Sequence, residues 1–195
     1  MIPYEFSAER LSRWMAYVLR HNPDRYGLQP DRHGAVDVET FLQVARQRYP
    51  ELSWEQFQEF LTTEGSGRFE LVSGRLRARY GHSIPVEPAG SPVEPLPQLY
   101  HGTDRSQLAE ILAAGLSPTE RRMIHLSETA EEAVTIARRK TENPALLRIR
   151  AQEASRAGVP FYRESNLYLA LSIPAAFLSE EPLPASSSAP VSPGS

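Results

Sequence analysis

Residues 84–98 read "IPVEPAGSPVEPLPQ", and this stretch divides the chain in two. Five of its fifteen residues are proline, and few of the others are large apolar side chains. Because proline fixes φ and lacks an amide donor, such a stretch favours neither a helix nor a paired strand and is predicted to be an extended linker. The sequence therefore predicts an N-terminal lobe over residues 1–83 and a C-terminal lobe over residues 99–180.

The residues before the linker predict three helices followed by a hairpin of two strands. Apolar side chains recur at helical spacing from Leu11 to Leu19, which predicts one buried helix face. Ser53 and Gln56 form a capping box that opens a helix, and Ser73-Gly74 is a turn signal between two strand-like runs. This order of elements is typical of a winged helix. The expected elements are helices over residues 8–21, 40–48 and 54–61, a short strand within 31–38, and the hairpin within 68–80.

The residues after the linker alternate short strands with helices. The run "QLYHGT" at 98–103 predicts a strand that ends in a turn at Gly102, and Thr129 with Glu132 forms another capping box. The other expected elements are strands at 123–127, 145–151, 158–163 and 166–173, and helices over 106–114, ending at Gly115, and from 130 to about 140. Residues 181–195 are rich in Pro and Ser and are predicted to form a disordered tail. The predicted fold class is therefore α+β.

The composition excludes several kinds of catalytic site. The chain of 195 residues has 41% hydrophobic residues, 23% charged residues and a formal net charge of −3, which is ordinary for a globular protein. It contains no cysteine, so thiolate nucleophiles, disulfides and cysteine zinc sites are excluded. The sequence also lacks a Gly-Lys-Ser/Thr phosphate loop, an HExxH motif and a clustered pair of Asp residues. Any chemistry is therefore expected to proceed without a metal.

The sequence also predicts where in the cell the protein acts. No apolar run approaches the length of a membrane span, and the first residues lack the basic and apolar regions of a signal peptide. We therefore expect a soluble cytoplasmic protein with no membrane partner.

Nearly all the basic residues are arginines: Lys140 is the only lysine among the 21 basic residues. Arginine is the better side chain for bidentate phosphate contacts, although genomic base composition is the simpler explanation for most of the excess.

Four of the five histidines lie in short blocks at the predicted ends of helices or strands, where rigid scaffolds carry functional side chains. The blocks are "LRHNP" (19–23), "RYGHS" (79–83), "LYHGT" (99–103) and "IHLS" (124–127). The pair Arg20-His21 has two interpretations: cationic residues that favour a helix C-terminus, or a rigid grip on an anion. In the third block, Gly102 either permits close approach of a ligand, with His101 and Thr103 as hydrogen-bonding groups, or belongs to a strand-ending turn.

Taken in order, these blocks resemble the NAD-dependent RNA 2'-phosphotransferase family, often called tRNA 2'-phosphotransferase. The resemblance covers residues 11–178 and rests on Leu-Arg-His-x-Pro at 19–23, Arg-x-x-x-Gly-His-Ser at 77–83 and His-Gly-Thr at 101–103. It implies a winged-helix-like N-terminal lobe joined to a C-terminal lobe of the ADP-ribosyltransferase fold. It also implies an enzyme of RNA processing, of the kind that acts in tRNA splicing, with NAD as a co-substrate and no metal.

The reaction implied by the resemblance removes an internal 2'-phosphate from RNA. The 2'-phosphate attacks the anomeric carbon of the nicotinamide ribose and expels nicotinamide, which leaves an ADP-ribosylated RNA 2'-phosphate. The neighbouring ribose hydroxyl then attacks phosphorus and releases RNA with a 2'-hydroxyl. The other products are nicotinamide and ADP-ribose 1'',2''-cyclic phosphate. Transfer RNA is one candidate substrate, and a monomer is expected.

The resemblance assigns roles to residues of every block. The family's catalytic set corresponds to Arg20, His21, Arg77 and Arg121, with Arg79 and Arg122 as near competitors of Arg77 and Arg121. The NAD-binding residues are His101, Gly102, Thr103, His125, Ser127 and Leu167, and the substrate-binding residues are His82 and Ser83. Fixed guanidinium groups would stabilise the charge of the transferred phosphate. His21 would either protonate the departing 2'-oxygen or bind the phosphate, and the sequence leaves both roles open.

The sequence departs from the family pattern at two places and leaves two alternative functions open. Tyr80 stands where the family usually has Gln, and "RESNLYLAL" at 163–171 lacks an Asn-Gly. One alternative is an ADP-ribosyltransferase acting on a protein or a nucleic-acid end, with Glu164 as the residue that activates the acceptor. The other is a non-catalytic winged-helix module that binds nucleic acid. The acidic run "WEQFQEFLTT" at 54–63 counts against this module, because a helix that reads duplex DNA needs basic residues.

Overall fold

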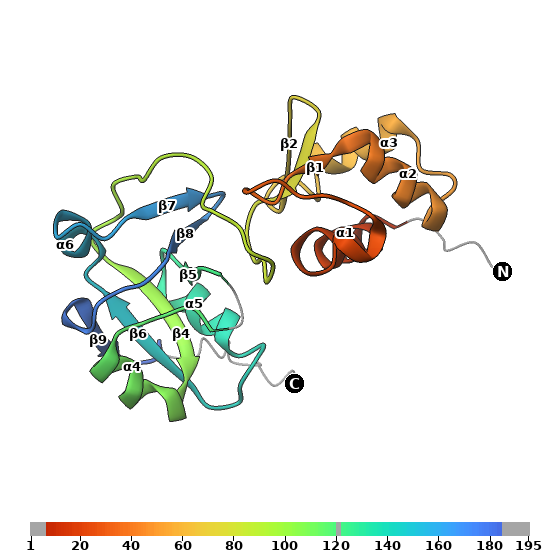
Figure 1. The fold of residues 1–195 in the computed structure, drawn as a ribbon. Coiled ribbons are helices and arrows are strands. Elements are labelled where there is room, and N and C mark those ends of the chain that lie inside the picture. The colour runs from red at the N-terminus through yellow and green to blue at the C-terminus, as the bar shows by residue number, and fades with distance from the viewer. Residues whose placement is uncertain (1–6, 120–121, 185–195) are drawn as a thin grey trace, which may run out of the picture. The chain divides into compact units, whose positions relative to one another are not determined.

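The structure is a computed structural model that describes residues 7–119 and 122–184 (Figure 1). Its contacts group the chain into two compact units. The first unit comprises Met1–Val93, Ser117–His125 and Pro160–Ser172, and the second comprises Glu94–Leu116, Leu126–Val159 and Ile173–Ser195. The lobe boundaries predicted from the linker stay predictions, because a grouping of contacts does not test which segments fold independently.

Three helices of the first unit agree with the prediction. Helix α1 (Ala8–His21) has the predicted bounds; Ser7 caps its start, and the Asn22 amide donates to the Val18 carbonyl at its end. Helix α2 (Val38–Arg48) begins two residues before the predicted Thr40, because the Asp37 side chain accepts from the Thr40 amide and caps the helix there. Helix α3 (Trp54–Thr62) has the predicted capping box.

The predicted hairpin is confirmed, and a third strand extends it. Strands β2 (Phe69–Val72) and β3 (Arg75–Ala78) pair in antiparallel register, and β1 (Val36–Asp37) pairs with the other edge of β3. The turn residues Ser73 and Gly74 both have left-handed φ, 49° and 75°, as a two-residue hairpin turn requires. This turn fixes the register, so that Glu70 lies directly opposite Arg77.

An aromatic core holds these elements together. Trp14 of α1 lies 5.7 Å from Phe41 of α2, and Phe60 of α3 lies 6.0 Å from Phe69 of β2 between ring centroids. These are distances at which aromatic pairs attract each other beyond their burial. Leu19, one residue before Arg20, is completely buried in the same core. The packing of α1 therefore fixes the position of its C-terminal residues.

The first unit also contains a hairpin from the far end of the chain. Strands β7 (Phe161–Glu164) and β8 (Leu167–Ala170) pair antiparallel, and β5 (Ile124–Leu126) completes a sheet of order β5-β8-β7. All four residues of β8 are buried. The Val93 amide donates to the Phe161 carbonyl at 2.7 Å, so the proline-rich stretch 84–98, which has no helix or strand, runs against this hairpin before entering the second unit.

The second unit has a sheet with three short helices. Strands β4 (Leu99–Asp104), β6 (Pro144–Ile149) and β9 (Leu178–Glu181) pair antiparallel in the order β4-β6-β9. Helix α5 (Ala130–Ala137) packs against β4 and β6, and the remaining helices are α4 (Leu108–Ala114) and α6 (Ala151–Arg156) (Figure 1). Three-residue 3₁₀ turns lie at Asp24–Tyr26, Arg105–Gln107 and Ala175–Phe177. The described chain is therefore a mixed α/β protein with small antiparallel sheets.

The second unit differs from the sequence expectations in several places. The strand predicted to turn at Gly102 continues to Asp104, because all six of its residues pair with β6. Helix α6 and strand β9 were not predicted; each is short, and β9 exists because its four residues pair with the edge of β6. The predicted tail begins with a strand residue, Glu181, and its part from residue 185 onward lies outside the described residues.

Across residues 7–119 and 122–184, every helix is too short or too polar to cross a membrane.

Candidate active site

The C-terminus of α1 carries two of the predicted catalytic residues and is tied to the loop after β3. The Arg20 carbonyl accepts hydrogen bonds from the amides of Ser83, at 3.0 Å, and Ile84, at 3.4 Å. The Nδ1 atom of His21 lies 2.9 Å from the hydroxyl of Ser83. The structure thus brings together Arg20, His21 and Ser83, which the resemblance had assigned from two separate blocks.

The Arg20 guanidinium is held by packing as well. Only 7% of Arg20 is exposed, and its Cζ lies 4.9 Å from the centroid of the Tyr80 ring, a distance at which the ring face attracts a cation. Gly81 lies on the same guanidinium: a Cβ there would come within 3.3 Å of Nη1. The Tyr80 ring also meets the His125 ring edge-on, at 5.7 Å. Tyr80, which departs from the family pattern, therefore contacts two predicted site residues.

His82 belongs to the same loop after β3, and its side chain is buried. Only 5% of the residue is exposed, and its Nε2 atom has no hydrogen-bond partner in the part of the chain that the structure describes. Burial, followed by the nearby charges of Arg20, Arg77 and His21, lowers its pKa from 6.5 to about 4. His82 is therefore neutral at pH 7 and supports the loop from inside. Its predicted contact with RNA stays a prediction.

The stability of the protein is expected to fall in mild acid because of His82. Between its folded pKa of about 4 and its unfolded value of 6.5, the unfolded chain binds a proton that the folded chain does not. The free energy of unfolding should therefore fall as the pH drops below 6.5, by up to about 1.4 kcal/mol per pH unit. Urea unfolding at pH 4.5, 5.5 and 7.5 measures this slope. The variant His82→Gln should flatten it, whereas His33→Gln should not; equal slopes in all three proteins would contradict the assignment.

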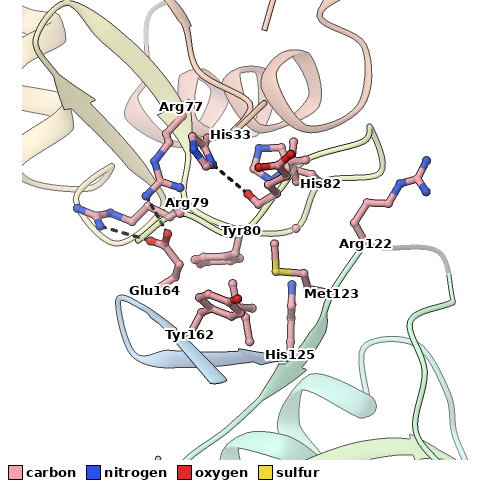
Figure 2. Close-up of a pocket in the computed structure, with 15 residues that line it drawn as sticks. His33, Arg77, Arg79, Tyr80, His82, Arg122, Met123, His125, Tyr162 and Glu164 are labelled. Carbon is pink, nitrogen blue, oxygen red and sulfur yellow. Dashed lines mark hydrogen bonds and ion pairs between the residues drawn. The ribbon is translucent and has the colours of Figure 1, made fainter. Parts of the chain in front are cut away.

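Arg77 lies in a partly buried group of four charges, of which Glu164 is the most buried, and we call this group the Arg77 network. Arg77 Nη2 contacts Glu70 Oε2 at 2.6 Å and Glu164 Oε1 at 2.7 Å, and Arg77 Nε donates to Glu70 Oε2 at 2.7 Å. Arg79 Nη1 lies 3.4 Å from Glu70 Oε1 and 3.6 Å from Glu164 Oε2. Figure 2 shows Arg77 and Arg79 converging on Glu164. Burial opposes the charge on Arg77, but the hydrogen bond and charge of Glu164, followed by those of Glu70, raise its pKa.

A pocket within the first unit lies between the Arg77 network and the loop after β3 (Figure 2). Its lining includes Arg77, Arg79, Tyr80, His82, Arg122 and His125. The Arg122 amide donates to the His82 carbonyl at 3.2 Å, which ties the segment before β5 to the loop after β3. Arg121, the fourth predicted catalytic residue, lies outside the described residues, whereas its near competitor Arg122 is part of the pocket wall.

The remaining predicted NAD-binding residues lie in the second unit, apart from Leu167, which is buried in β8 of the first. Tyr100 and Ser127 exchange two backbone hydrogen bonds of 2.9 Å, so Ser127 lies beside the His101-Gly102-Thr103 block. Successive side chains of a strand point to opposite faces. Tyr100 packs against α5, which leaves His101 and Thr103 on the other face, where Thr103 donates a hydrogen bond to Gln107.

Gly102 has a packing reason for being glycine. A Cβ at this position would lie 2.4 Å from the Ala133 carbonyl oxygen and 2.6 Å from the Ala137 Cβ, both in α5. Helix α5 therefore lies directly on the backbone of β4 and needs the absence of a side chain there. The sequence left two interpretations of Gly102 open, close approach of a ligand or a strand-ending turn, and the close neighbour is instead α5. A role of Gly102 toward NAD stays a prediction.

The variant Gly102→Ala is expected to lose about 1–3 kcal/mol of unfolding free energy, because the added methyl group forces α5 away from β4. Urea unfolding followed by circular dichroism measures the loss. Gly67→Ala is a matched control, since its Cβ would meet only the Ser165 hydroxyl, at an ordinary 3.4 Å. Unchanged stability of Gly102→Ala would show that α5 moves away at no cost.

Comparison with known proteins agrees with the resemblance. A family model described as RNA 2'-phosphotransferase, Tpt1 / KptA family, matches residues 7–171. The chain belongs to this RNA 2'-phosphotransferase family. A probable RNA 2'-phosphotransferase of Thermococcus kodakarensis is 37% identical over 155 residues, which cover 80% of this chain and 86% of the relative. Probable RNA 2'-phosphotransferases of Archaeoglobus fulgidus, 32% identical over 93% of this chain and 84% of the relative, and of Lacticaseibacillus paracasei, 34% identical over 87% and 91%, are also similar.

Two carboxylates that contact Arg77 had no predicted part in this activity: Glu164, which lines the pocket, and Glu70, which does not. Glu70 had a signal in the sequence: a two-residue turn at Ser73-Gly74 pairs position 70 with position 77. Glu164 was noted only as a feature of the ADP-ribosyltransferase alternative. Its contact with Arg77 joins residues 87 positions apart, for which local sequence patterns carry no signal.

Proposed function

We propose that this protein transfers an internal RNA 2'-phosphate to NAD and releases RNA with a 2'-hydroxyl, nicotinamide and ADP-ribose 1'',2''-cyclic phosphate. Family membership supports the substrate class. One observation supports the site: the loop after β3 contacts Arg20 through the Tyr80 ring and His21 through the Ser83 hydroxyl, and Tyr80 lines the same pocket as Arg77. Basic side chains gathered at one loop form an environment suited to a multiply charged anion, and an internal 2'-phosphate is such an anion.

In the proposed reaction the basic side chains act on the phosphate in both steps. Arg20 and Arg77 would hold its oxygens while one of them attacks the anomeric carbon of the nicotinamide ribose and nicotinamide leaves. They would stabilise the charge again when the adjacent ribose hydroxyl attacks phosphorus. His21, whose Nδ1 faces the Ser83 hydroxyl, would give a proton to the departing RNA 2'-oxygen. The proton released by the attacking hydroxyl balances this transfer.

NAD is proposed as the co-substrate, and the residues described above suit it. His101 and Thr103 share the face of β4 opposite α5, and their imidazole and hydroxyl groups are hydrogen-bonding partners for ribose and amide groups. Ser127 adds a hydroxyl beside them, and His125 and Leu167 complete the proposed set. Gly102 contributes by letting α5 support the strand. We propose no metal for this reaction.

The finer architecture and the natural substrate also belong to this proposal. Helices α1, α2 and α3 followed by the β2–β3 hairpin have the element order of a winged helix, and we propose that they form a winged-helix-like lobe. We propose an ADP-ribosyltransferase-like lobe for the strands and helices after the linker. Transfer RNA with a 2'-phosphate at a splice junction is the proposed substrate of a cytoplasmic, monomeric enzyme.

The test is incubation of the purified protein with NAD and an oligoribonucleotide that carries one internal 2'-phosphate. We expect the phosphate to be lost, and nicotinamide and a cyclic phosphate of ADP-ribose to appear together in the mass spectrum. Reactions without NAD, and with the same oligonucleotide bearing a 2'-hydroxyl, are the controls. No loss of phosphate with NAD present would refute the proposal.

The same experiment separates the two alternatives. An ADP-ribosyltransferase with another acceptor would leave a stable ADP-ribosylated product and no cyclic phosphate. A binding module would retain the oligonucleotide without consuming NAD. Family membership supports the phosphotransferase over both, and the two carboxylate oxygens of Glu164 are already engaged by Arg77 and Arg79, which disfavours a role for Glu164 in activating an acceptor.

A further inference from the structure

We propose that Glu164 is a positioning residue for Arg77, which it orients so that one edge of the guanidinium remains available to a phosphate in the pocket. This inference rests on the proposed function, because it gives Arg77 a phosphate to bind. Glu164 acts only through Arg77.

The donors of Arg77 divide into an occupied and an unoccupied edge. Arginine has five N–H groups in a planar fork. The Nε donor and the two donors of Nη2 face Glu70 and Glu164, at 2.6–2.7 Å. The Nη1 group makes no hydrogen bond or ion pair within the described residues, and Arg77 lines the pocket. Two N–H groups of Arg77 therefore remain for an anion, and the two carboxylates hold the rest of the fork.

Glu164 is the more buried of the two carboxylates that contact Arg77, and it therefore restricts the arginine more than Glu70 does. The Glu164 side chain is 5% exposed and the Arg77 side chain 13%, whereas Glu70 is 26% exposed. A buried carboxylate needs a charged partner to remain ionised, and each oxygen of Glu164 faces a different arginine, Oε1 toward Arg77 and Oε2 toward Arg79. The geometry of this contact leaves Arg77 little freedom to rotate.

The position of Glu164 in the chain shows which two parts of the first unit its contact with Arg77 connects. Glu70 comes from β2, the hairpin partner of β3, so it moves with Arg77. Glu164 comes from the end of β7, and pairs in register with Leu167, a proposed NAD-binding residue. The Glu164 contact therefore sets Arg77 relative to the β7–β8 hairpin, which Glu70 cannot do.

A double-mutant cycle with Glu164→Gln and Arg77→Ala tests this role. Glutamine has the same length as glutamate but lacks the charge that holds both arginines. We expect Glu164→Gln to lower kcat for phosphate removal by about tenfold to a hundredfold, with KM for NAD unchanged. Because Glu164 acts through Arg77, Glu164→Gln should cost much less when Arg77 is already alanine. Glu164→Asp, which restores the charge, should recover part of kcat, and Glu181→Gln, which weakens an ion pair in the second unit, should leave kcat unchanged.

Two results would overturn the proposal: wild-type kcat in Glu164→Gln, or equal losses from Glu164→Gln with and without Arg77. Failure of the proposed function gives a different result, an inactive wild-type protein. The cycle is then read from the dissociation constant of the 2'-phosphorylated oligonucleotide, by fluorescence anisotropy. Weaker and non-additive binding in the variants, with no change for the 2'-hydroxyl oligonucleotide, would support the positioning role, and unchanged binding would refute it.

Discussion

Replacing Arg20 with alanine is expected to slow phosphate removal by on the order of 10²–10³-fold, as the loss of a preorganised donor does in other enzymes. The physical reason is that Arg20 is fixed before the substrate arrives. Its carbonyl accepts hydrogen bonds from the amides of Ser83 and Ile84, its guanidinium lies on the Tyr80 ring, and Gly81 also lies close to it. A charge held in this way stabilises the transition state without having to reorganise.

The measurement is single-turnover loss of the 2'-phosphate from an oligoribonucleotide at saturating NAD. Arg13→Ala is the matched control: it removes an arginine of the same helix whose side chain is 75% exposed and pairs with Glu9. Arg20→Lys keeps the charge but not the planar fork, and we expect it to recover only part of the rate. Thermal unfolding of each variant shows that it is folded. A rate for Arg20→Ala within about twofold of wild type would remove Arg20 from the proposed mechanism.

Replacing Glu164 with alanine is expected to lower the free energy of unfolding by about 3 kcal/mol, the lower end of what is lost when one partner of a buried ion pair is removed. The Arg77 guanidinium, whose side chain is 13% exposed, would keep Glu70 but lose its most buried partner. A cavity would also remain at the end of β7. This variant measures stability, whereas Glu164→Gln, which keeps the volume, measures the positioning of Arg77.

Guanidinium or urea unfolding, followed by circular dichroism, measures the loss. Glu181→Ala provides the comparison, because its ion pair with Arg148 is 3.5 Å long with side chains 29% and 38% exposed, and such pairs contribute about 0–1 kcal/mol. A similar small loss in both variants would mean that solvent screens the Arg77 network despite its burial.

The hydrogen bonds between the end of α1 and the loop after β3 show which parts of the site sequence patterns could predict. The helical spacing of apolar residues predicted α1 and its end at His21, so the sequence places Arg20 and His21 at a helix terminus. The partner of that terminus was not predictable from spacing. The bonds from Ser83 to Arg20 and His21 span more than sixty residues, and they form because α1 and β3 pack on one aromatic core.

In the Arg77 network, too, one contact could be predicted from the sequence and another could not. A two-residue turn fixes hairpin register, so the pairing of Glu70 with Arg77 follows from Ser73-Gly74 alone. The sequence offers no comparable rule for Glu164, which reaches Arg77 only because the β7–β8 hairpin joins the first unit. Gly102 is a further case: its sequence setting allowed a ligand or a strand-ending turn, and the structure shows α5 packed on the backbone there.

The sequence by itself determined the local elements of this protein and its family: helices from periodicity and caps, a hairpin from its turn, and the RNA 2'-phosphotransferase family from blocks in order. These depend on interactions between residues a few positions apart, or on the residue types themselves. The tertiary structure decided which charges are paired, which histidine is buried and neutral, and which edge of Arg77 remains available. Those properties depend on desolvation and on contacts between distant segments, and neither exists until the chain has packed.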